Sequence, residues 1–202
     1  MKNKWVLFIS GLTLASFGAA SFSSAEMGMD AFSTFVMGLS RIMKLTFGTG
    51  CIVAGFFLLL LLALLDRSYV KIGGVIYAFG LGMGINLWFQ LLPQSFYELP
   101  ALFRLFVGIL FFTLGIGCYI LADVGSGAVE AFSLYLAAKF KLSLTVVRIG
   151  LDTLFLILGV LSGVTVGVGT VIGVALMGFL INSWLKLSDI FFQKSYSKAE
   201  SN

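Results

Sequence analysis

Arg148 and Asp152 are the ionisable pair in this chain whose spacing could support chemistry inside an apolar helix. A separation of four residues puts both side chains on one helix face, where they can form an ion pair. Charged groups inside a membrane span are costly, and by default they mark a route for a substrate or an ion. Two interpretations have about equal weight. The functional one is a gated ion pair or an anion-binding arginine, and the structural one is a salt bridge between packed helices.

Two further carboxylates, Asp30 and Glu130, stand near the starts of two short segments. A carboxylate at the first turn of a helix can cap its free N–H groups and complement its dipole. Capping is the favoured interpretation. The alternative is a cation- or proton-coupled group that lines a cavity between the two halves of the protein.

Two asparagines, Asn86 and Asn182, occupy equivalent positions in apolar stretches. Hydrogen bonding between helices is the favoured role for such amides in a membrane protein. Contact with a substrate is the alternative. The candidate pathway residues are therefore Arg148, Asp152, Glu130, Asp30, Asn86 and Asn182.

The residue types argue against an enzyme. The chain has no histidine, which is the commonest general base and a frequent metal ligand. Cys51 and Cys118 without histidine do not make a metal site, so they are expected to be apolar core residues. There is no phosphate-binding loop and no nucleophile elbow. We therefore expect no catalytic residues, no cofactor and no metal.

Composition identifies the environment that must hold these side chains. Hydrophobic residues make up 59% of the chain and charged residues 11%. A soluble domain cannot bury that much apolar surface, and the stretch at 47–65 is close to the 20 or so residues that span a bilayer. The net charge of +4 comes from cations at the ends of the predicted helices, which membrane topology explains without nucleic acid.

The chain also repeats itself. Residues 11–60 align without a gap onto 108–157 with 11 identities in 50, and residues 71–92 align onto 167–188 with 8 in 22. Chance would give about one in ten. The first helix resembles a secretory signal peptide, but its match to 108–122 predicts that it is retained. The identical residues of the first copy are Gly11, Gly18, Ala25, Gly28, Ala31, Phe35, Leu39, Lys44, Leu45, Ile52, Leu59, Gly73, Val75, Ile76, Gly82, Ile85, Asn86, Trp88 and Leu91.

The repeat predicts one all-α membrane domain of two copies, repeat one at 5–93 and repeat two at 101–188, followed by a short polar cytoplasmic tail at 189–202. Each copy holds three long helices and one short segment, and Pro93 and Pro100 flank the linker. The long helices are expected at 5–24, 47–65, 73–92, 102–122, 145–162 and 168–187, and the short segments at 30–43 and 127–140.

The short segments decide the topology. At about 1.5 Å per residue they cover about half of a hydrocarbon core, so we expect half-helices or re-entrant segments. Three spans per copy give an inverted 3+3 repeat. A 4+4 arrangement, with both short segments spanning, is the alternative, and the distribution of positive charge favours it by one residue. We give segment length more weight, which predicts that Arg41 and Lys139 lie on opposite sides of the membrane.

The loops, short segments and later helices carry a set of short motifs: those at 28–33, 38–40, 47–49 and 125–130, together with Arg148-x-x-x-Asp152, Gly169-Thr170 and Gly178-x-x-x-Asn182. In these motifs the chain resembles the YczE/YyaS/YitT family of bacterial membrane proteins. The family's loop proline is replaced here by Ala31 and Ala128, which puts the rigidity of the loops in question. The chain ends soon after the last expected span, so it resembles the YczE branch more than the YitT-type members with a soluble C-terminal domain.

What the resemblance implies is a multi-pass protein of the bacterial cytoplasmic membrane, with no catalytic residues to carry over. Our leading hypothesis is a transporter or permease-like protein for a small solute or ion, with its site between the repeats. The alternative is a non-transporting scaffold or regulator of another membrane protein. A third and weaker hypothesis, lipid handling, rests only on the 21 phenylalanines.

Overall fold

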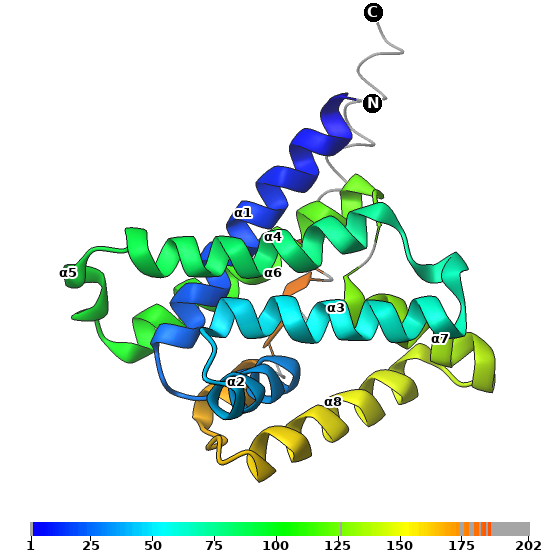
Figure 1. Ribbon diagram of the computed structural model, residues 1–202. Helices are drawn as coiled ribbons and strands as arrows, with labels where there is room; N and C mark the ends of the chain where they lie inside the picture. Colours follow the sequence, from blue (N-terminus) through cyan, green and yellow to red (C-terminus); the bar gives the residue numbers. More distant parts are fainter. Residues whose placement is uncertain are drawn as a thin grey trace, which may run out of the picture.

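The computed structural model describes residues 2–125, 127–173, 176–177, 180–181, 183–184 and 186, and within these all regular secondary structure is helical. Eight α-helices and one 3-10 helix have defined bounds, and helical residues continue from 168. Figure 1 shows their arrangement. The elements are α1 (Lys2–Ser24), α2 (Ala31–Met43), α3 (Phe47–Leu65), η1 (Arg67–Tyr69), α4 (Ile72–Leu91), α5 (Gln94–Tyr97), α6 (Ala101–Ala122), α7 (Ala128–Phe140) and α8 (Leu144–Leu161).

Five of these helices, α1, α3, α4, α6 and α8, are long and apolar enough to cross a bilayer. The prediction of an all-α membrane protein is confirmed. The predicted short segments are the 13-residue helices α2 and α7, each about 20 Å long at the usual rise per residue. The sixth predicted span, 168–187, is described only in part, with gaps after residue 173.

The helices α1 and α6 pack against each other in opposite directions. Near one end Lys4 pairs with Asp123 at 3.7 Å, and near the other the hydroxyl of Ser21 donates to the carbonyl of Arg104. Two glycines, Gly18 and Gly115, let the backbones approach closely along the crossing, because a Cβ on either would clash with backbone atoms of the other helix. This antiparallel pair joins the two halves of the chain.

The two halves repeat the same local backbone features at a constant spacing of 97 residues. The residues that precede α2 and α7 both have φ −58° and ψ 164°. Both short helices end on a lysine in the left-handed region, Lys44 and Lys141, each with φ 55°. Thr46 and Ser143 then cap α3 and α8, and each side-chain oxygen accepts a hydrogen bond from the N–H three residues on.

The short helices lie toward opposite ends of the molecule, α2 near the start of α3 and α7 near its end (Figure 1). Arg41 of α2 donates to the carbonyl of Gly163, just past the end of α8. The ring of Tyr135 in α7 packs edge-on against Tyr69 in η1, just past the end of α3, with the centroids 5.7 Å apart. The starts of both short helices point inward, since Ala31 and Ala128 belong to one buried cluster.

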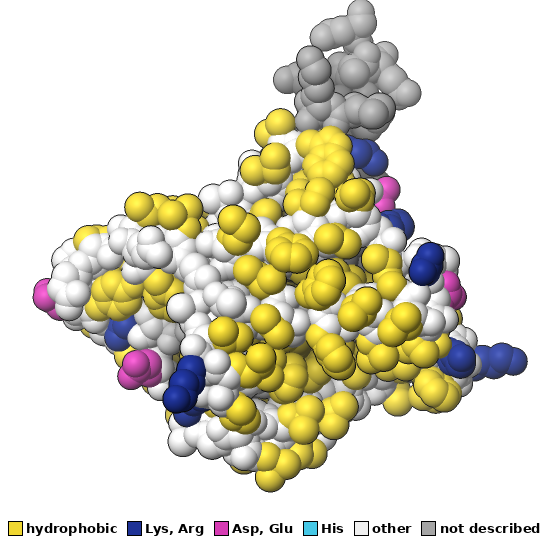
Figure 2. Space-filling model, in the orientation of Figure 1, with side chains coloured by type: hydrophobic (Ala, Val, Ile, Leu, Met, Phe, Trp, Pro, Cys, Tyr) yellow, Lys and Arg dark blue, Asp and Glu magenta, His cyan; other side chains and the backbone are white. Residues whose placement is uncertain are grey.

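Charged side chains gather at the two ends of this elongated body. Figure 2 shows them beside α5 at one end and beside η1 and α7 at the other, with hydrophobic side chains over most of the face between. Exposed Leu60 and Phe57 of α3 and Ile76 and Met83 of α4 belong to the apolar surface of the long helices. Such a surface suits contact with lipid acyl chains.

Candidate functional site

The predicted pair, Arg148 and Asp152, forms in the structure. The Nε atom of Arg148 lies 3.2 Å from Oδ2 of Asp152 on the same face of α8. A third side chain joins them, since Nη1 of Arg148 lies 3.4 Å from Oε1 of Glu130 in the first turn of α7. One guanidinium therefore holds two carboxylates, and the group carries a formal charge of −1. Glu130, Arg148 and Asp152 are called the ion triad below.

Local capping sets the position of the ion triad. Ser143 caps α8, which places Arg148 in the second turn and Asp152 one turn deeper. α7 begins next to the same region, so Glu130 approaches from a different helix. The three side chains remain 35–39% exposed, which leaves them open to water, to a solute or to a covering group. The arrangement can hold one mobile cation or release one carboxylate when the pairing changes.

Asp30 caps α2, as the favoured interpretation predicted. Its Oδ2 accepts a hydrogen bond of 3.2 Å from the N–H of Ser33. Its Oδ1 is buried and has no hydrogen-bond partner among the described residues. Asp30 directly precedes Ala31, which shares a buried cluster with Ala128 of α7 and Leu151 of α8, so the carboxylate lies in the same region of the molecule as the ion triad.

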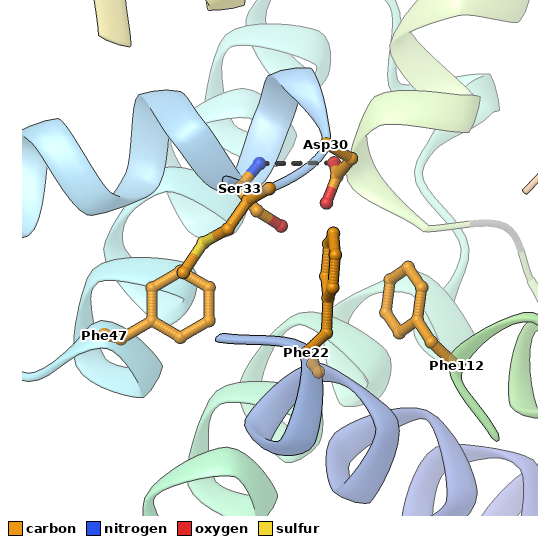
Figure 3. A pocket seen from close by; sticks show the side chains of 7 residues that line it. Phe22, Asp30, Ser33, Phe47 and Phe112 are labelled. Carbon is orange, nitrogen blue, oxygen red and sulfur yellow. Dashed lines mark hydrogen bonds between the residues drawn. The ribbon is translucent and has the colours of Figure 1, made fainter. Parts of the chain in front are cut away.

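A narrow crevice lies beside Asp30, and its walls come from α1, α2, α3, α6 and the loop before α2. Figure 3 shows the Asp30 carboxylate and Ser33 beside the rings of Phe22, Phe47 and Phe112. The crevice is closed to a water-sized molecule in this structure, and its lining includes neither Arg148 nor Asp152. The full lining is Ala19, Phe22, Met29, Asp30, Ser33, Phe47 and Phe112.

Asn86 has the interhelical role that was favoured for it. Its Nδ2 donates to the hydroxyl of Thr49 at 3.2 Å and so connects α4 to α3. The two backbones cross closely there, since a Cβ on Gly48 would meet the carbonyl of Gly82 and the Asn86 side chain. Asn182, the equivalent residue of the second copy, lies outside the described residues.

Sequence reasoning missed the crevice. The chain has 21 phenylalanines, so nothing in the sequence marks Phe22, Phe47 and Phe112 as neighbours. One signal could have pointed to Ser33, because the repeat aligns it with Glu130. For Glu130 no capping hydrogen bond is found among the described residues: it stands in the first turn of α7, and its carboxylate reaches the guanidinium of Arg148 on α8.

Comparison with known proteins supports the resemblance seen in the motifs. A model described as a family of unknown function, DUF6198, matches residues 2–186. The uncharacterized protein YyaS of Bacillus subtilis (strain 168) is 26% identical over 192 residues, covering 94% of this chain and 96% of that protein. The uncharacterized membrane protein YczE of the same organism is 22% identical over 179 residues, covering 88% and 83%. No solved structure gives a significant match.

Proposed function

The chain belongs to DUF6198, a family of unknown function, and we propose that it is a permease-like transporter of a small solute or ion in the bacterial cytoplasmic membrane. The observation that carries the proposal is the inward convergence of the two short helices. Ala31 and Ala128, their first residues, share a buried cluster, and each helix presents a carboxylate near its start. Transporters commonly build their sites where discontinuous helices end within the membrane.

The proposed site lies between the two repeats and includes Asp30 and the ion triad. Charges held at membrane depth are costly unless they are paired or serve a route. The ion triad is paired but keeps a net negative charge, and Oδ1 of Asp30 has no hydrogen-bond partner in the part of the chain that the structure describes. Both features suit a site that binds and releases a positive charge during a transport cycle.

An inverted 3+3 topology fits this proposal. The antiparallel packing of α1 on α6, which are equivalent helices of the two copies, supports it, because equivalent spans of an inverted repeat cross in opposite directions. Arg41 lies by the end of α8, where it donates to the carbonyl of Gly163. Lys139 lies over the ring of Tyr135, which packs against Tyr69 just past the end of α3. In the 3+3 arrangement these two helix ends are on opposite sides of the membrane.

Cysteine labelling tests the topology directly. In a variant with Cys51 and Cys118 replaced, single cysteines at Arg41 and Lys139 should react with a membrane-impermeant maleimide from opposite sides of oriented vesicles. Cysteines at Arg67 and Lys139 serve as a matched pair that should react from the same side, because η1 packs near α7. Labelling of residues 41 and 139 from one side would contradict the inverted topology and favour the 4+4 arrangement.

A flux assay tests transport. We expect proteoliposomes to exchange a radiolabelled solute from a panel of amines, amino acids, sugars and inorganic ions. We expect Asp152→Asn to lower that exchange by tenfold or more at equal reconstitution, because it removes one charge from the ion triad. Glu98→Gln, in the exposed linker, is the matched control. Flux that is unchanged in Asp152→Asn would remove this residue from the mechanism.

The closed crevice favours the alternative function, a non-transporting partner of another membrane protein. A scaffold needs no route through its core, and tight packing around Asp30 suits it. The same proteoliposomes separate the two proposals. Absence of exchange across the whole panel, with protein that elutes as a single species, would favour the scaffold.

A further inference from the structure

Each half of the chain places a carboxylate near the start of its short helix, but only one of them has an ion pair among the described residues. Glu130 contacts Arg148 at 3.4 Å. Asp30 is partly exposed and has no ion pair there, and its buried Oδ1 has no hydrogen-bond partner. A buried carboxylate oxygen without a hydrogen-bond partner or counterion is disfavoured. The two halves therefore differ in what each still requires.

The repeat identifies the missing group. At the spacing of 97 residues, the position of Arg148 corresponds to Cys51 in the first half, and Glu130 corresponds to Ser33. Cys51 is 8% exposed and belongs to one buried cluster with Met29 and Phe47, two residues that line the Asp30 crevice. Where the second half has a guanidinium beside its carboxylate, the first half has a neutral thiol.

The crevice beside Asp30 has the chemistry of a site for an organic cation. Phe22, Phe47 and Phe112 present aromatic rings, and Asp30 and Ser33 bring the only side-chain oxygens of the lining (Figure 3). Aromatic faces attract ammonium and guanidinium groups, and a carboxylate fixes the charge. A desolvated alkali or alkaline-earth ion needs about six oxygen ligands, which this lining does not supply.

We propose that the Asp30 crevice binds the head group of a small alkylammonium ion, which stands in the first half where the Arg148 guanidinium stands in the second. The inference rests on the proposed function and names its substrate class. The positive end of the α2 dipole opposes a cation here, but it amounts to about half a charge against the full charge of Asp30. Oδ2 already satisfies an N–H of that helix end, which leaves Oδ1 for the ligand.

Binding requires the walls of the crevice to separate, since they leave no room for a water-sized molecule in this structure. The walls come from several helices, with Phe22 on α1, Phe47 on α3 and Phe112 on α6. The proposal therefore includes an outward movement of one of these helix ends when the ammonium group enters.

The test measures the thermal unfolding midpoint of the detergent-purified protein with n-propylammonium chloride, sodium chloride or 1-propanol at matched concentrations. A ligand of the folded state raises the midpoint and the rise saturates. We expect a saturable rise with n-propylammonium and none with sodium or propanol. Asp30→Asn should weaken the apparent affinity by about tenfold or more, since the amide keeps the cap but loses the charge.

Two controls keep the result interpretable. Glu98→Gln, an exposed carboxylate outside the crevice, should respond as the parent protein does. Phe47→Leu is a second variant, because Leu144 holds the equivalent position at the start of α8 and the helix tolerates leucine there. We expect Phe47→Leu to weaken n-propylammonium binding a few-fold by removing one aromatic face.

Several outcomes would overturn the inference: an equal response to sodium, no response to n-propylammonium, or a full response in Asp30→Asn. The result is separate from the proposed function. Binding of n-propylammonium without any solute exchange in proteoliposomes would contradict the proposed transport function but support the alkylammonium site. Exchange of a neutral or anionic solute without n-propylammonium binding would contradict the alkylammonium site but support the transport function.

Discussion

In the first half of the chain, Asp30 caps α2, whereas in the second half Gly127 takes the same backbone conformation and the carboxylate comes from Glu130. Glu130 has an ion-pair partner in Arg148, and within the described part of the chain Asp30 has no such partner and Oδ1 of Asp30 has no hydrogen bond. The backbone of the two halves is thus alike where their charges differ. The two halves therefore share backbone features of the short helices and differ in the side chains at the inward helix ends.

The difference separates two kinds of position. Glycines at the α1–α6 crossing and lysines in the left-handed region are the same in both halves, because backbone contact and positive φ restrict the residue. Neither a positive φ nor a close backbone contact restricts the equivalent positions of Cys51 and Arg148, and their side chains differ: a neutral thiol in the first half and a charged guanidinium in the second. The asymmetric positions are therefore the ones to examine for function, and the predictions below test each kind in turn.

The largest effect is expected where the halves are most alike, at the α1–α6 crossing. Gly18→Leu and Gly115→Leu should each prevent stable folding, because a side chain at either position meets backbone atoms of the facing helix. The measurement is the fraction of detergent-purified protein that elutes as a single species in size-exclusion chromatography. Gly150→Ala is the control, since a Cβ there meets no atom within 4 Å. Normal elution of either leucine variant would show that the crossing is not tightly packed.

An intermediate effect is expected from Arg148→Met. The change leaves Glu130 and Asp152 without a counterion and should destabilise the protein by about 2 kcal/mol, below the roughly 3–5 kcal/mol of a fully buried pair because these side chains are about a third exposed. Thermal unfolding in detergent measures the loss. Adding Glu130→Gln and Asp152→Asn should restore most of it, because no unpaired charge then remains. No recovery in the triple variant would indicate that Arg148 acts through packing.

The smallest effect is expected from the matched caps. Thr46→Ala and Ser143→Ala each remove a side-chain oxygen that accepts from the backbone, so each should cost about 1 kcal/mol. Thermal unfolding of the two variants provides the comparison. Equal losses would support equivalent folding roles for α3 and α8. A much larger loss at one cap would mean that the halves differ in stability as well as in charge.

Much of the helical layout could be predicted from the sequence. Apolar length fixed five long helices, and the repeat placed the short ones within a residue of their observed starts and ends. The i, i+4 spacing of Arg148 and Asp152 was enough to predict their contact, because helix geometry is local. The six-span count and the inverted repeat stay predictions, since the described residues of the last span are interrupted by gaps.

The crevice and the third member of the ion triad could not be predicted in the same way. Glu130 and Arg148 are 18 residues apart on different helices, so only the packing of α7 beside α8 joins them. Phe22 and Phe112 come from helices of different halves, and composition does not distinguish them from the other phenylalanines. Contacts between distant elements depend on crossing angles and side-chain shape, which a single sequence does not encode in a short pattern.

The sequence by itself determined the membrane environment, the helical elements and their caps, because these depend on apolar length, local spacing and the residues at helix ends. The tertiary structure decided which carboxylate is neutralised. Packing of α7 against α8 brings Arg148 to Glu130, whereas Asp30 lies beside aromatic rings and forms no ion pair among the described residues. A carboxylate near the start of a short helix is thus paired with an arginine in one half and has no ion pair among the described residues in the other. The difference depends on tertiary packing because the partners come from different helices.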